Sequence, residues 1–218
     1  MVEKFQSEII SIKNITEDVK HFVLTTPDNF TFIPGQYISI VADTEEEKLR
    51  RAYSIGSKPM PNKLELCIKI IPDGALTPKL DLMKQGDKLE LIGPLGKFIL
   101  KEESKEKELI FVCAGTGISP FRSMIQYLLE KGHDKPITLI AGYRHHVLYD
   151  EEFTSLAKEH PNFKYEVALS SKGKHVQDIL PVSKEAHYYL CGLDQMINSV
   201  KNILTESGVE TIISEKYD

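Results

Sequence analysis

The residues that most clearly suggest ligand chemistry form a glycine-rich loop, Ala-Gly-Thr-Gly-Ile-Ser-Pro, at residues 114–120. Its glycines allow a ligand to approach the backbone, and the N–H groups that open the following helix favour a pyrophosphate. Ser119 is the predicted N-cap of that helix, and Pro120 its first residue. The loop is not a P-loop, because no Gly-Lys-Ser/Thr follows, and Pro120 replaces the third glycine of G-x-G-x-x-G. Taken alone, it fits a tight turn without a ligand equally well.

A second motif, Arg-Arg-Ala-Tyr-Ser-Ile-Gly-Ser, occupies residues 50–57. Within four residues it offers a guanidinium with forked donors for phosphate, an aromatic face for stacking and a hydroxyl for a ring heteroatom. In isolation, the better interpretation is an edge strand with an exposed arginine and a packed tyrosine.

Two further turns lead into helical patterns. Residues 73–78 read Asp-Gly-Ala-Leu-Thr-Pro, which predicts Thr77 as an N-cap and Pro78 as a first helical residue, although a capped surface helix explains this equally. Residues 189–196 place Cys191 at the end of a buried strand, where a cysteine is usually a packing residue. At the ligand edge of a parallel sheet, the same residue would lie beside a cofactor.

The first half of the chain is dominated by short strand patterns. Residues 64–70 alternate apolar and mostly polar side chains with a period of two, as a half-buried strand does. Similar runs occupy residues 8–12, 20–25, 36–41 and 88–92. Short strands separated by Pro, Gly and Asp predict a small antiparallel β-barrel.

The second half alternates strands and helices. A continuous apolar run at residues 109–113 precedes apolar residues that recur at helical spacing through 121–129. Further strands are predicted at 136–141, 163–169, 188–191 and 209–213, and helices at 151–159 and 194–206. The alternation predicts a Rossmann-like α/β domain whose parallel sheet binds ligands at the carboxyl ends of its strands.

An almost wholly charged stretch at residues 101–108 separates the two patterns. A segment of this composition is not expected in a core, and we interpret it as an exposed connection. The predicted organisation is therefore a barrel domain at residues 1–102 and an α/β domain at residues 103–218.

Composition excludes several classes of function. The chain carries 27 basic and 32 acidic side chains, a net charge of −5 that argues against a nucleic-acid binder. Its three cysteines are too few for a four-thiolate iron–sulfur centre, and the adjacent His145 and His146 lack the spacing of metal ligands, so no metal is expected. No signal peptide or apolar membrane span is apparent, which predicts a cytoplasmic protein that does not act at a membrane.

The order of the motifs is more specific than any one of them. Arg-x-Tyr-Ser, Gly-x-x-Thr, Gly-Pro-Leu-Gly-Lys-Phe, Gly-Thr-Gly-Ile-Ser-Pro and Cys-Gly-x-x-x-Met follow one another along essentially the whole chain. Together with Pro-Gly-Gln-Tyr at residues 34–37, this order resembles the ferredoxin–NADP reductase superfamily. The resemblance implies a flavin-binding barrel, a nucleotide-binding α/β domain and hydride transfer from NAD(P)H to the flavin. It favours FAD over FMN by analogy with relatives of this size.

The resemblance also implies roles for individual residues. Arg51 would hold the flavin phosphate, Tyr53 would lie along the ring system, and Ser54 would hydrogen-bond near flavin N5. Cys191 would lie against the nicotinamide, and Glu215 would be the acidic partner of Ser54 and Cys191; these three are the expected catalytic residues. The other residues implied at the flavin are Ala52, Ile68, Lys69, Ile70, Gly74, Leu76, Thr77 and the terminal aromatic Tyr217. The other residues implied at the nicotinamide dinucleotide are Thr116, Gly117, Ile118, Ser119, Pro120, Gly192, Asp194 and Met196.

The choice of nicotinamide coenzyme depends on the segment after the strand that ends near residue 169. NAD sites favour an acidic residue on the ribose, whereas NADP sites place cations near the 2′-phosphate. Ser171, Lys172 and Lys174 follow that strand with no acidic residue, and Arg144 is within possible reach of the nucleotide, which favours NADPH over NADH. A solvated hairpin tip explains the two lysines equally well.

The sequence thus predicts a flavoprotein oxidoreductase that passes electrons from NAD(P)H through FAD to a separate acceptor. Ferredoxin, flavodoxin, an oxygenase component and free flavin all remain open as that acceptor, and the oligomeric state is not predicted. The alternatives are a flavin-binding electron-transfer subunit that works only inside a larger complex, and a nucleotide-binding regulatory module without flavin.

Overall fold

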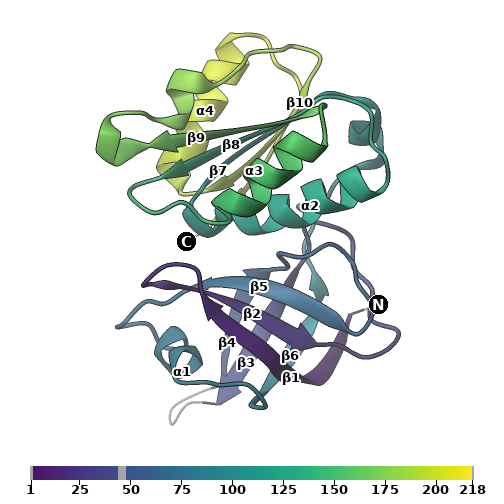
Figure 1. Ribbon diagram of the computed structural model, residues 1–218, viewed down its shortest axis with the longest axis vertical. Helices are drawn as coiled ribbons and strands as arrows, with labels where there is room; N and C mark the ends of the chain where they lie inside the picture. Colours follow the sequence, from purple (N-terminus) through teal and green to yellow (C-terminus); the bar gives the residue numbers. More distant parts are fainter. Residues whose placement is uncertain (1, 44–47, 218) are drawn as a thin grey trace. The chain divides into compact units, whose positions relative to one another are not determined.

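The computed structural model describes residues 2–43 and 48–217. Contacts between Cα atoms divide the chain into two compact units, coloured along the sequence in Figure 1. The first unit comprises Met1–Ile99 and Ser119–Tyr127, and the second comprises Leu100–Ile118 and Leu128–Asp218. Within the described residues, no helix is both long enough and apolar enough to cross a membrane.

The first unit is built on a six-stranded antiparallel sheet, as the short alternating runs predicted. In order across the sheet, its strands are β4 (Lys48–Ser54), β3 (Tyr37–Asp43), β6 (Lys88–Leu95), β1 (Glu3–Asn14), β2 (Val19–Thr25) and β5 (Lys63–Lys69). The two outer strands meet where Ile55, directly after β4, pairs with Leu66 of β5, so the sheet curls into a barrel. Its interior is filled by fully buried apolar side chains, including Phe22, Leu24 and Ile38.

Strand β1 is longer than the run of residues 8–12 from which it was predicted. Its first half pairs with β6 and its second half with β2, and the register shifts between Ile9 and Ser11. This bulge interrupts the period of two, which is why the sequence pattern covers only the middle of the strand.

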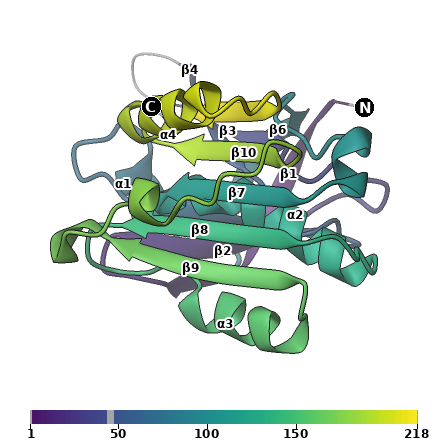
Figure 2. The same ribbon diagram turned by 90° about the horizontal axis from the view of Figure 1, so that it is seen from above.

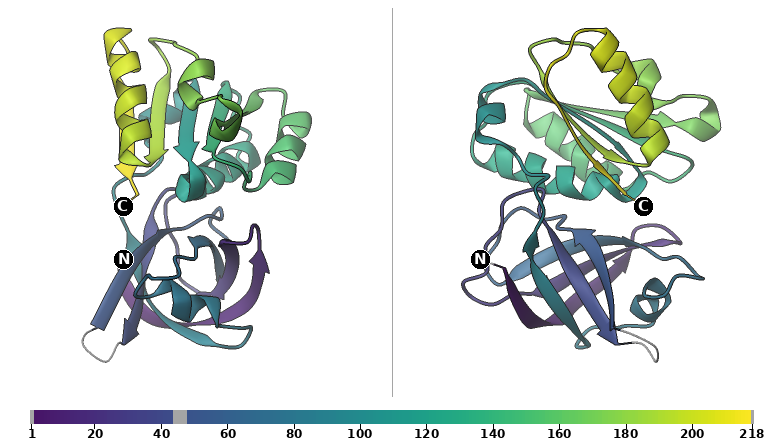
Figure 3. Two further views of the ribbon diagram at one scale, coloured as in Figure 1. Left: turned by 90° about the vertical axis from the view of Figure 1, so that its left-hand side faces the viewer. Right: turned by 180° about the vertical axis from the view of Figure 1, so that it is seen from behind.

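The second unit contains a five-stranded parallel sheet, which confirms the expected α/β architecture. In order across the sheet, its strands are β11 (Ile212–Lys216), β10 (His187–Gly192), β7 (Leu109–Ala114), β8 (Ile137–Tyr143) and β9 (Phe163–Leu169) (Figure 2). Helix α3 (Asp150–Glu159) lies in front of this sheet in Figure 1, and α4 (Asp194–Glu206) lies in front of it in the view from behind in Figure 3. The two helices therefore cover opposite faces, as right-handed crossovers require when the strand order reverses at β7.

Several element boundaries differ from the predicted ones. Helix α2 (Ile118–Glu130) begins before Ser119, so Ser119 lies inside the first turn instead of capping it. The short helix α1 (Thr77–Asp81) likewise begins at Thr77, whose hydroxyl bonds to Ile71 and makes no cap. The last strand begins at Ile212, three residues later than predicted.

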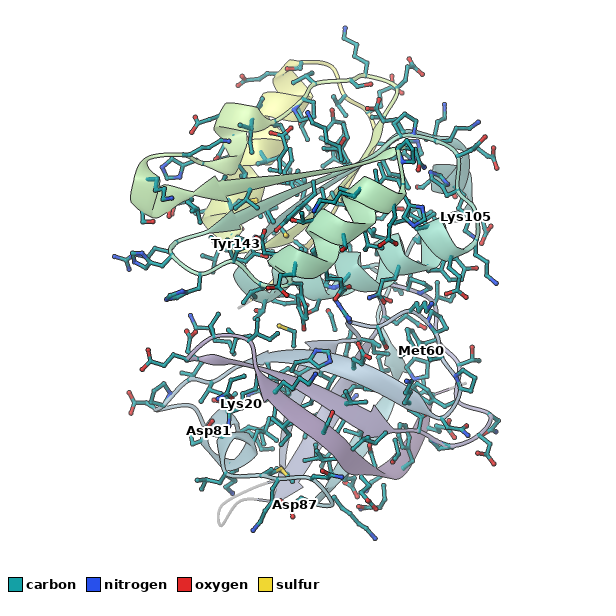
Figure 4. The ribbon with its side chains drawn as sticks, in the orientation of Figure 1. Lys20, Met60, Asp81, Asp87, Lys105 and Tyr143 are labelled. Atoms are coloured by element: carbon teal, nitrogen blue, oxygen red, sulfur yellow. The ribbon has the colours of Figure 1, made fainter. Side chains whose placement is uncertain are left out.

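The charged segment at residues 101–108 contains one buried serine, which is bonded to β10 of the second unit. Its middle forms a short 3₁₀ helix, η1 (Glu102–Glu106), whose Lys105 is labelled in Figure 4. Ser104 is fully buried, and its Oγ lies 2.9 Å from His187 Nδ1 and 2.9 Å from the Tyr189 hydroxyl. The expectation of an entirely exposed connection is therefore wrong at Ser104, because its hydroxyl has partners on β10.

We expect Ser104→Ala to lower the free energy of unfolding of the second unit by about 1–2 kcal/mol, since it removes a buried hydroxyl bonded to two side chains. Urea denaturation measures this loss. Ser155→Ala, on an exposed position of α3, is the matched control and should change little. Equal stability of the two variants would contradict the anchoring role of Ser104.

Candidate functional site

Strand β4 carries the Arg-x-Tyr-Ser motif at the edge of the barrel sheet. Arg51 and Ala52 are exposed, Tyr53 is half-buried, and Ser54 is 5% exposed. The Ile55 N–H donates to the Gln36 carbonyl at 3.0 Å, which fixes the alternation of the ladder between β4 and β3. In that ladder, the backbone polar groups of Ala52 and Ser54 point away from β3.

The electrostatics of this edge suit a phosphate and a polar ring. Burial raises the pKa of Tyr53 to about 12, an effect that Arg51 partly opposes, so the phenol stays protonated at neutral pH. The exposed Arg51 guanidinium supplies forked donors. The motif therefore offers a cation, a neutral hydrogen-bonding aromatic ring and a hydroxyl along one strand.

Residues 68–70 are implied at the flavin by the resemblance, but two of them direct backbone groups toward residues 18–20 instead. The Ile70 N–H is already bonded to the Asp18 carbonyl at 2.7 Å, and Ile68 pairs with Lys20. By the alternation of the antiparallel ladder, the Lys69 backbone groups point away from β2. Of the three residues, Lys69 thus has the backbone groups that are directed away from the neighbouring strand.

The loop that leads into α1 is tightly folded around Gly74. The Thr77 hydroxyl accepts from the Ile71 N–H and donates to the Ile71 carbonyl, both at 2.9 Å. A Cβ on Gly74 would lie 2.9 Å from Thr77 Oγ1 and 3.0 Å from the Ile71 carbonyl oxygen, so this turn has no room for a side chain. Leu76 is buried beneath it.

The end of α1 is held by a charged contact with the barrel. Lys20 Nζ lies 2.7 Å from Asp81 Oδ1 and donates to the Asp81 carbonyl at 2.9 Å; Figure 4 labels both residues. Leu82, the residue that follows the last turn of the helix, is 83% exposed. The short helix is thus held at both ends.

In the second unit, the glycine-rich loop lies against the end of β10. Gly115–Gly117 form a 3₁₀ turn, η2, which runs directly into α2. A Cβ on Gly117 would lie 2.4 Å from the Cys191 carbonyl oxygen, so only glycine allows this approach. Thr116 is half-buried and Ile118 is fully buried at the start of the helix.

The first turn of α2 is almost completely buried. Ser119 is 1% exposed, and its Oγ has no hydrogen-bond partner among the described residues. Pro120 is buried beside it and needs no N–H partner at this position. A buried hydroxyl in the first turn, next to the helix N–H groups, fits a polar ligand such as a dinucleotide pyrophosphate.

Cys191 lies in a row of residues that crosses three strands at their carboxyl ends. It is in register with Cys113 on β7 and with Glu215 on β11. Burial raises the pKa of the Cys191 thiol well above its ordinary value; Glu215 and Cys113 add to this rise, and a hydrogen bond with Tyr217 opposes it. Burial likewise raises the pKa of Cys113. Both thiols are neutral at physiological pH, which suits Cys191 to contact a ligand and not to act as a nucleophile.

Glu215 is the titratable carboxyl of this row. Burial raises its pKa to about 6. Two residues after Glu215, the Tyr217 N–H donates to the Gly192 carbonyl at 3.0 Å. This bond holds Tyr217 at the end of β10. Gly192 itself has φ +143°, and a Cβ there would meet the Ala114 nitrogen at 2.9 Å.

We expect Glu215→Gln to raise the melting temperature at pH 8 and to have little effect near pH 5. A carboxyl whose pKa is higher in the folded than in the unfolded protein destabilises the fold once it ionises, from the ordinary value of 4.5 up to about 6 and above. Thermal unfolding at both pH values measures the difference, with the exposed Glu210→Gln as control. If Glu215→Gln changed the melting temperature equally at pH 5 and pH 8, the raised pKa of Glu215 would be contradicted.

The residues at the start of α4 are less suited to a pocket than predicted. Asp194 is exposed and its carboxylate lies 2.5 Å from Lys216 Nζ. A hydrogen bond with Lys216 is the main reason that the pKa of Asp194 is lowered. Met196 is half-buried and packs against the core of the second unit.

The loops after β8 and β9 come together at the carboxyl edge of the sheet. The Ser171 N–H donates to the Arg144 carbonyl at 3.2 Å, so the two predicted segments are neighbours. Arg144, Ser171 and Lys172 are all exposed, and Tyr143, at the end of β8, is labelled in Figure 4. The adjacent His145 and His146 are exposed, and no cluster of potential metal ligands occurs in the described part of the chain.

One polar residue of α2 was not identified from the sequence. Arg122 is 8% exposed and bonds to Gly56 and Glu65 of the barrel unit. Its partners are 66 and 57 residues away in the chain, so no local pattern indicates them.

Two domain families match the chain. Residues 6–99 match the oxidoreductase FAD-binding domain, and residues 111–202 match the oxidoreductase NAD-binding domain. The chain therefore belongs to the ferredoxin–NADP reductase family of two-domain flavin-dependent oxidoreductases.

Individual relatives agree with this assignment. The toluate 1,2-dioxygenase electron transfer component of Pseudomonas putida is 29% identical over 221 residues, which cover 94% of this chain and 65% of the relative. Ferredoxin–NADP reductase B of Sorangium cellulosum is 27% identical over 241 residues, covering 99% of this chain and 98% of the relative. A ferredoxin NADP+ reductase from Neisseria gonorrhoeae, solved with bound FAD and NADP, shares the fold with a TM-score of 0.84 at 19% identity over 98% of each chain. The chain thus spans just under two thirds of the first relative and nearly all of the second.

Proposed function

We propose that this chain oxidises NAD(P)H, transfers the hydride to FAD and passes the electrons on to a separate acceptor. The observation that carries the proposal is the close approach of Gly117 to Cys191, because it places the glycine-rich loop at the end of β10, where a buried neutral thiol and a carboxyl lie in one row. The Arg-x-Tyr-Ser edge strand of the FAD-binding domain supplies matching groups for a flavin.

Within this proposal, the residues of the first unit bind and orient the flavin. Arg51 holds its phosphate, Tyr53 lies along its ring system, and the Ser54 hydroxyl donates a hydrogen bond beside N5. The turn from Gly74 to Thr77 accommodates the pyrophosphate close to its backbone, and the Lys69 backbone groups contact the ring edge. When bound, FAD supplies the capacity to accept a hydride and release electrons singly or in pairs.

The residues of the second unit bind the nicotinamide coenzyme. The N–H groups of residues 116–119 receive the pyrophosphate, with Pro120 following them in the first turn of α2, and Cys191 with Gly192 packs against the nicotinamide. The neutral thiol excludes water from this contact, and Glu215 holds or releases a proton beside it. Tyr217 is the terminal aromatic side chain that shields the flavin. Holding the hydride donor and the hydride acceptor in one geometry makes the transfer effectively unimolecular.

NADPH is the proposed coenzyme. Arg144 and Lys172 lie on loops that are joined by the hydrogen bond between Ser171 and Arg144, so two exposed cationic residues lie on neighbouring loops at the carboxyl edge of the sheet. No acidic residue follows β9 directly. A 2′-phosphate is the group that such cations recognise.

The proposed acceptor is a separate redox protein: a ferredoxin, a flavodoxin or an oxygenase component. Relatives of this chain include the electron transfer component of a toluate dioxygenase and a ferredoxin–NADP reductase. The three cysteines of this chain are fewer than a four-thiolate cluster needs, so an iron–sulfur acceptor would lie in another domain or chain.

Anaerobic titration of the purified protein with NADPH and with NADH tests the proposal. We expect a yellow protein whose flavin absorbance is bleached at a lower concentration of NADPH than of NADH, and whose released flavin is FAD. Reduction of an artificial acceptor by the isolated chain would separate an autonomous reductase from a subunit that needs a larger complex. A colourless protein that binds a nucleotide would instead indicate a regulatory module, and preferential bleaching by NADH would contradict the coenzyme assignment.

A further inference from the structure

Arg122 is a buried charge on helix α2 with two partners in the barrel. Its side chain is 10% exposed. Nη1 donates to the Gly56 carbonyl at 2.7 Å and to Glu65 Oε2 at 2.6 Å. All three residues belong to the first unit, which includes the segment Ser119–Tyr127 of this helix.

The two acceptors lie where the outer strands of the barrel sheet meet. The Gly56 N–H donates to the Glu65 carbonyl at 2.7 Å, and the neighbouring residues Ile55 and Leu66 form a β-bridge. Arg122 therefore binds both sides of the seam between the end of β4 and β5. Gly56 follows Ser54 by two residues, so the guanidinium is attached directly to the end of the Arg-x-Tyr-Ser strand.

A second contact fixes the same strand end one helical turn further along α2. The Gln126 side-chain carbonyl accepts from the Lys58 N–H at 3.1 Å. Between these two contacts, a Cβ on Gly35 would lie 2.4 Å from Met124 Cε, so the Met124 side chain of the helix packs against the barrel backbone at Gly35. Residues 56–58 are thus held at two points along α2.

Stability alone is a weak reason for burying this ion pair. Glu65 is 16% exposed, and His21 Nε2 lies 3.6 Å from the same carboxylate oxygen. Buried ion pairs are often replaced by apolar residues without loss of stability, and their best-attested use is to specify one arrangement. The guanidinium suits that use, because its planar set of donors fixes direction as well as distance.

We infer that Arg122 is a positioning residue for hydride transfer, an inference that rests on the proposed function. The loop assigned to the coenzyme pyrophosphate leads into α2 four residues before Arg122, and the hydroxyl assigned to flavin N5 precedes Gly56 by two residues. Arg122 therefore fixes the strand end that carries Ser54 on the helix that begins with the coenzyme loop. Displacements of about 1 Å between reacting groups lower rates by up to about 100-fold.

Anaerobic stopped-flow measurement of flavin reduction tests this inference, because the concentration dependence separates the limiting rate from the coenzyme dissociation constant. We expect Arg122→Met to lower the limiting rate about tenfold, with flavin retained and the dissociation constant changed by less than about threefold. Arg122→Lys should recover part of the rate, since it restores the charge and one donor. Lys131→Met, an exposed charge loss just beyond α2, is the control and should keep the native rate.

The double variant Arg122→Met/Glu65→Gln removes both buried charges and replaces the single variant in this measurement if the single variant does not fold. We expect the same fall in the limiting rate of flavin reduction. A native limiting rate in whichever of these variants folds, with flavin bound, would overturn the positioning role and leave the proposed function intact. A native protein whose flavin is reduced by neither coenzyme would overturn the proposed function, and this inference with it.

Discussion

Gly117→Ala is expected to destabilise the α/β unit and to abolish measurable coenzyme binding. A Cβ at this position would lie 2.4 Å from the Cys191 carbonyl oxygen and 2.8 Å from the Cys191 carbonyl carbon. Both atoms belong to the backbone of β10, which is hydrogen-bonded to β7 on one side and to β11 on the other. Moving either atom would therefore disrupt these hydrogen bonds. Overpacking in a well-packed core typically costs about 1–3 kcal/mol, and a clash with a fixed backbone is expected at the upper end of this range.

The same clash explains the expected loss of binding. Relief requires that the turn at residues 115–117 move away from the end of β10, which displaces the N–H groups that open α2. The free energy of unfolding in urea measures the first effect, and the dissociation constant of NADP+ measured by flavin absorbance changes measures the second.

Gly115→Ala is the matched control for this prediction. Gly115 has φ +56° but nothing within 4 Å of a Cβ, so alanine there incurs the left-handed backbone cost of about 1 kcal/mol without a clash. If Gly117→Ala were no less stable than Gly115→Ala, the β10 backbone would have to move to accept the added Cβ. If Gly117→Ala kept the native affinity for NADP+, the placement of the coenzyme at this loop would be contradicted.

Elements with an alternating or helical apolar pattern were predictable from the sequence, because one face of each is buried. Strand β5 and helix α4 fall close to their predicted ranges for this reason. Strand β4 has no such pattern, since it ends the sheet and leaves Arg50, Arg51 and Ala52 exposed. Its residues were noticed for their chemistry, and the edge strand was inferred from the motif and not from an apolar period.

The parts of the site that could not be predicted depend on contacts between distant residues. Ser104 lies in a charged run, and only its partners on β10, more than 80 residues away, explain its burial. Thr77 was expected to cap a helix, but Ile71 offers both a donor and an acceptor to its hydroxyl. Resemblance suggested that Glu215 and Cys191 act together; the register of β10 and β11 places them opposite each other, although their roles remain a prediction.

Ser54→Ala is expected to lower the limiting rate of flavin reduction about 100-fold while the protein retains its flavin. Ser54 is 5% exposed at the end of β4, and its backbone groups point away from β3. In the proposed function its hydroxyl donates a hydrogen bond beside the atom that accepts the hydride, where charge develops during the transfer. Arg51 and Tyr53 remain to bind the cofactor, so the loss should fall on the rate.

Anaerobic stopped-flow spectroscopy at saturating NADPH gives this rate, and the ratio of flavin absorbance to protein absorbance gives the occupancy. Ser39→Ala is the matched control, because Ser39 is also a buried serine and pairs with Ala52 from the neighbouring strand β3. Ser54→Thr keeps a hydroxyl at this position and should retain more of the rate than Ser54→Ala. If Ser54→Ala with full flavin occupancy were reduced at the native rate, hydride transfer would not depend on this hydroxyl. If Ser54→Ala lost its flavin, the role of Ser54 would be cofactor binding and not hydride transfer.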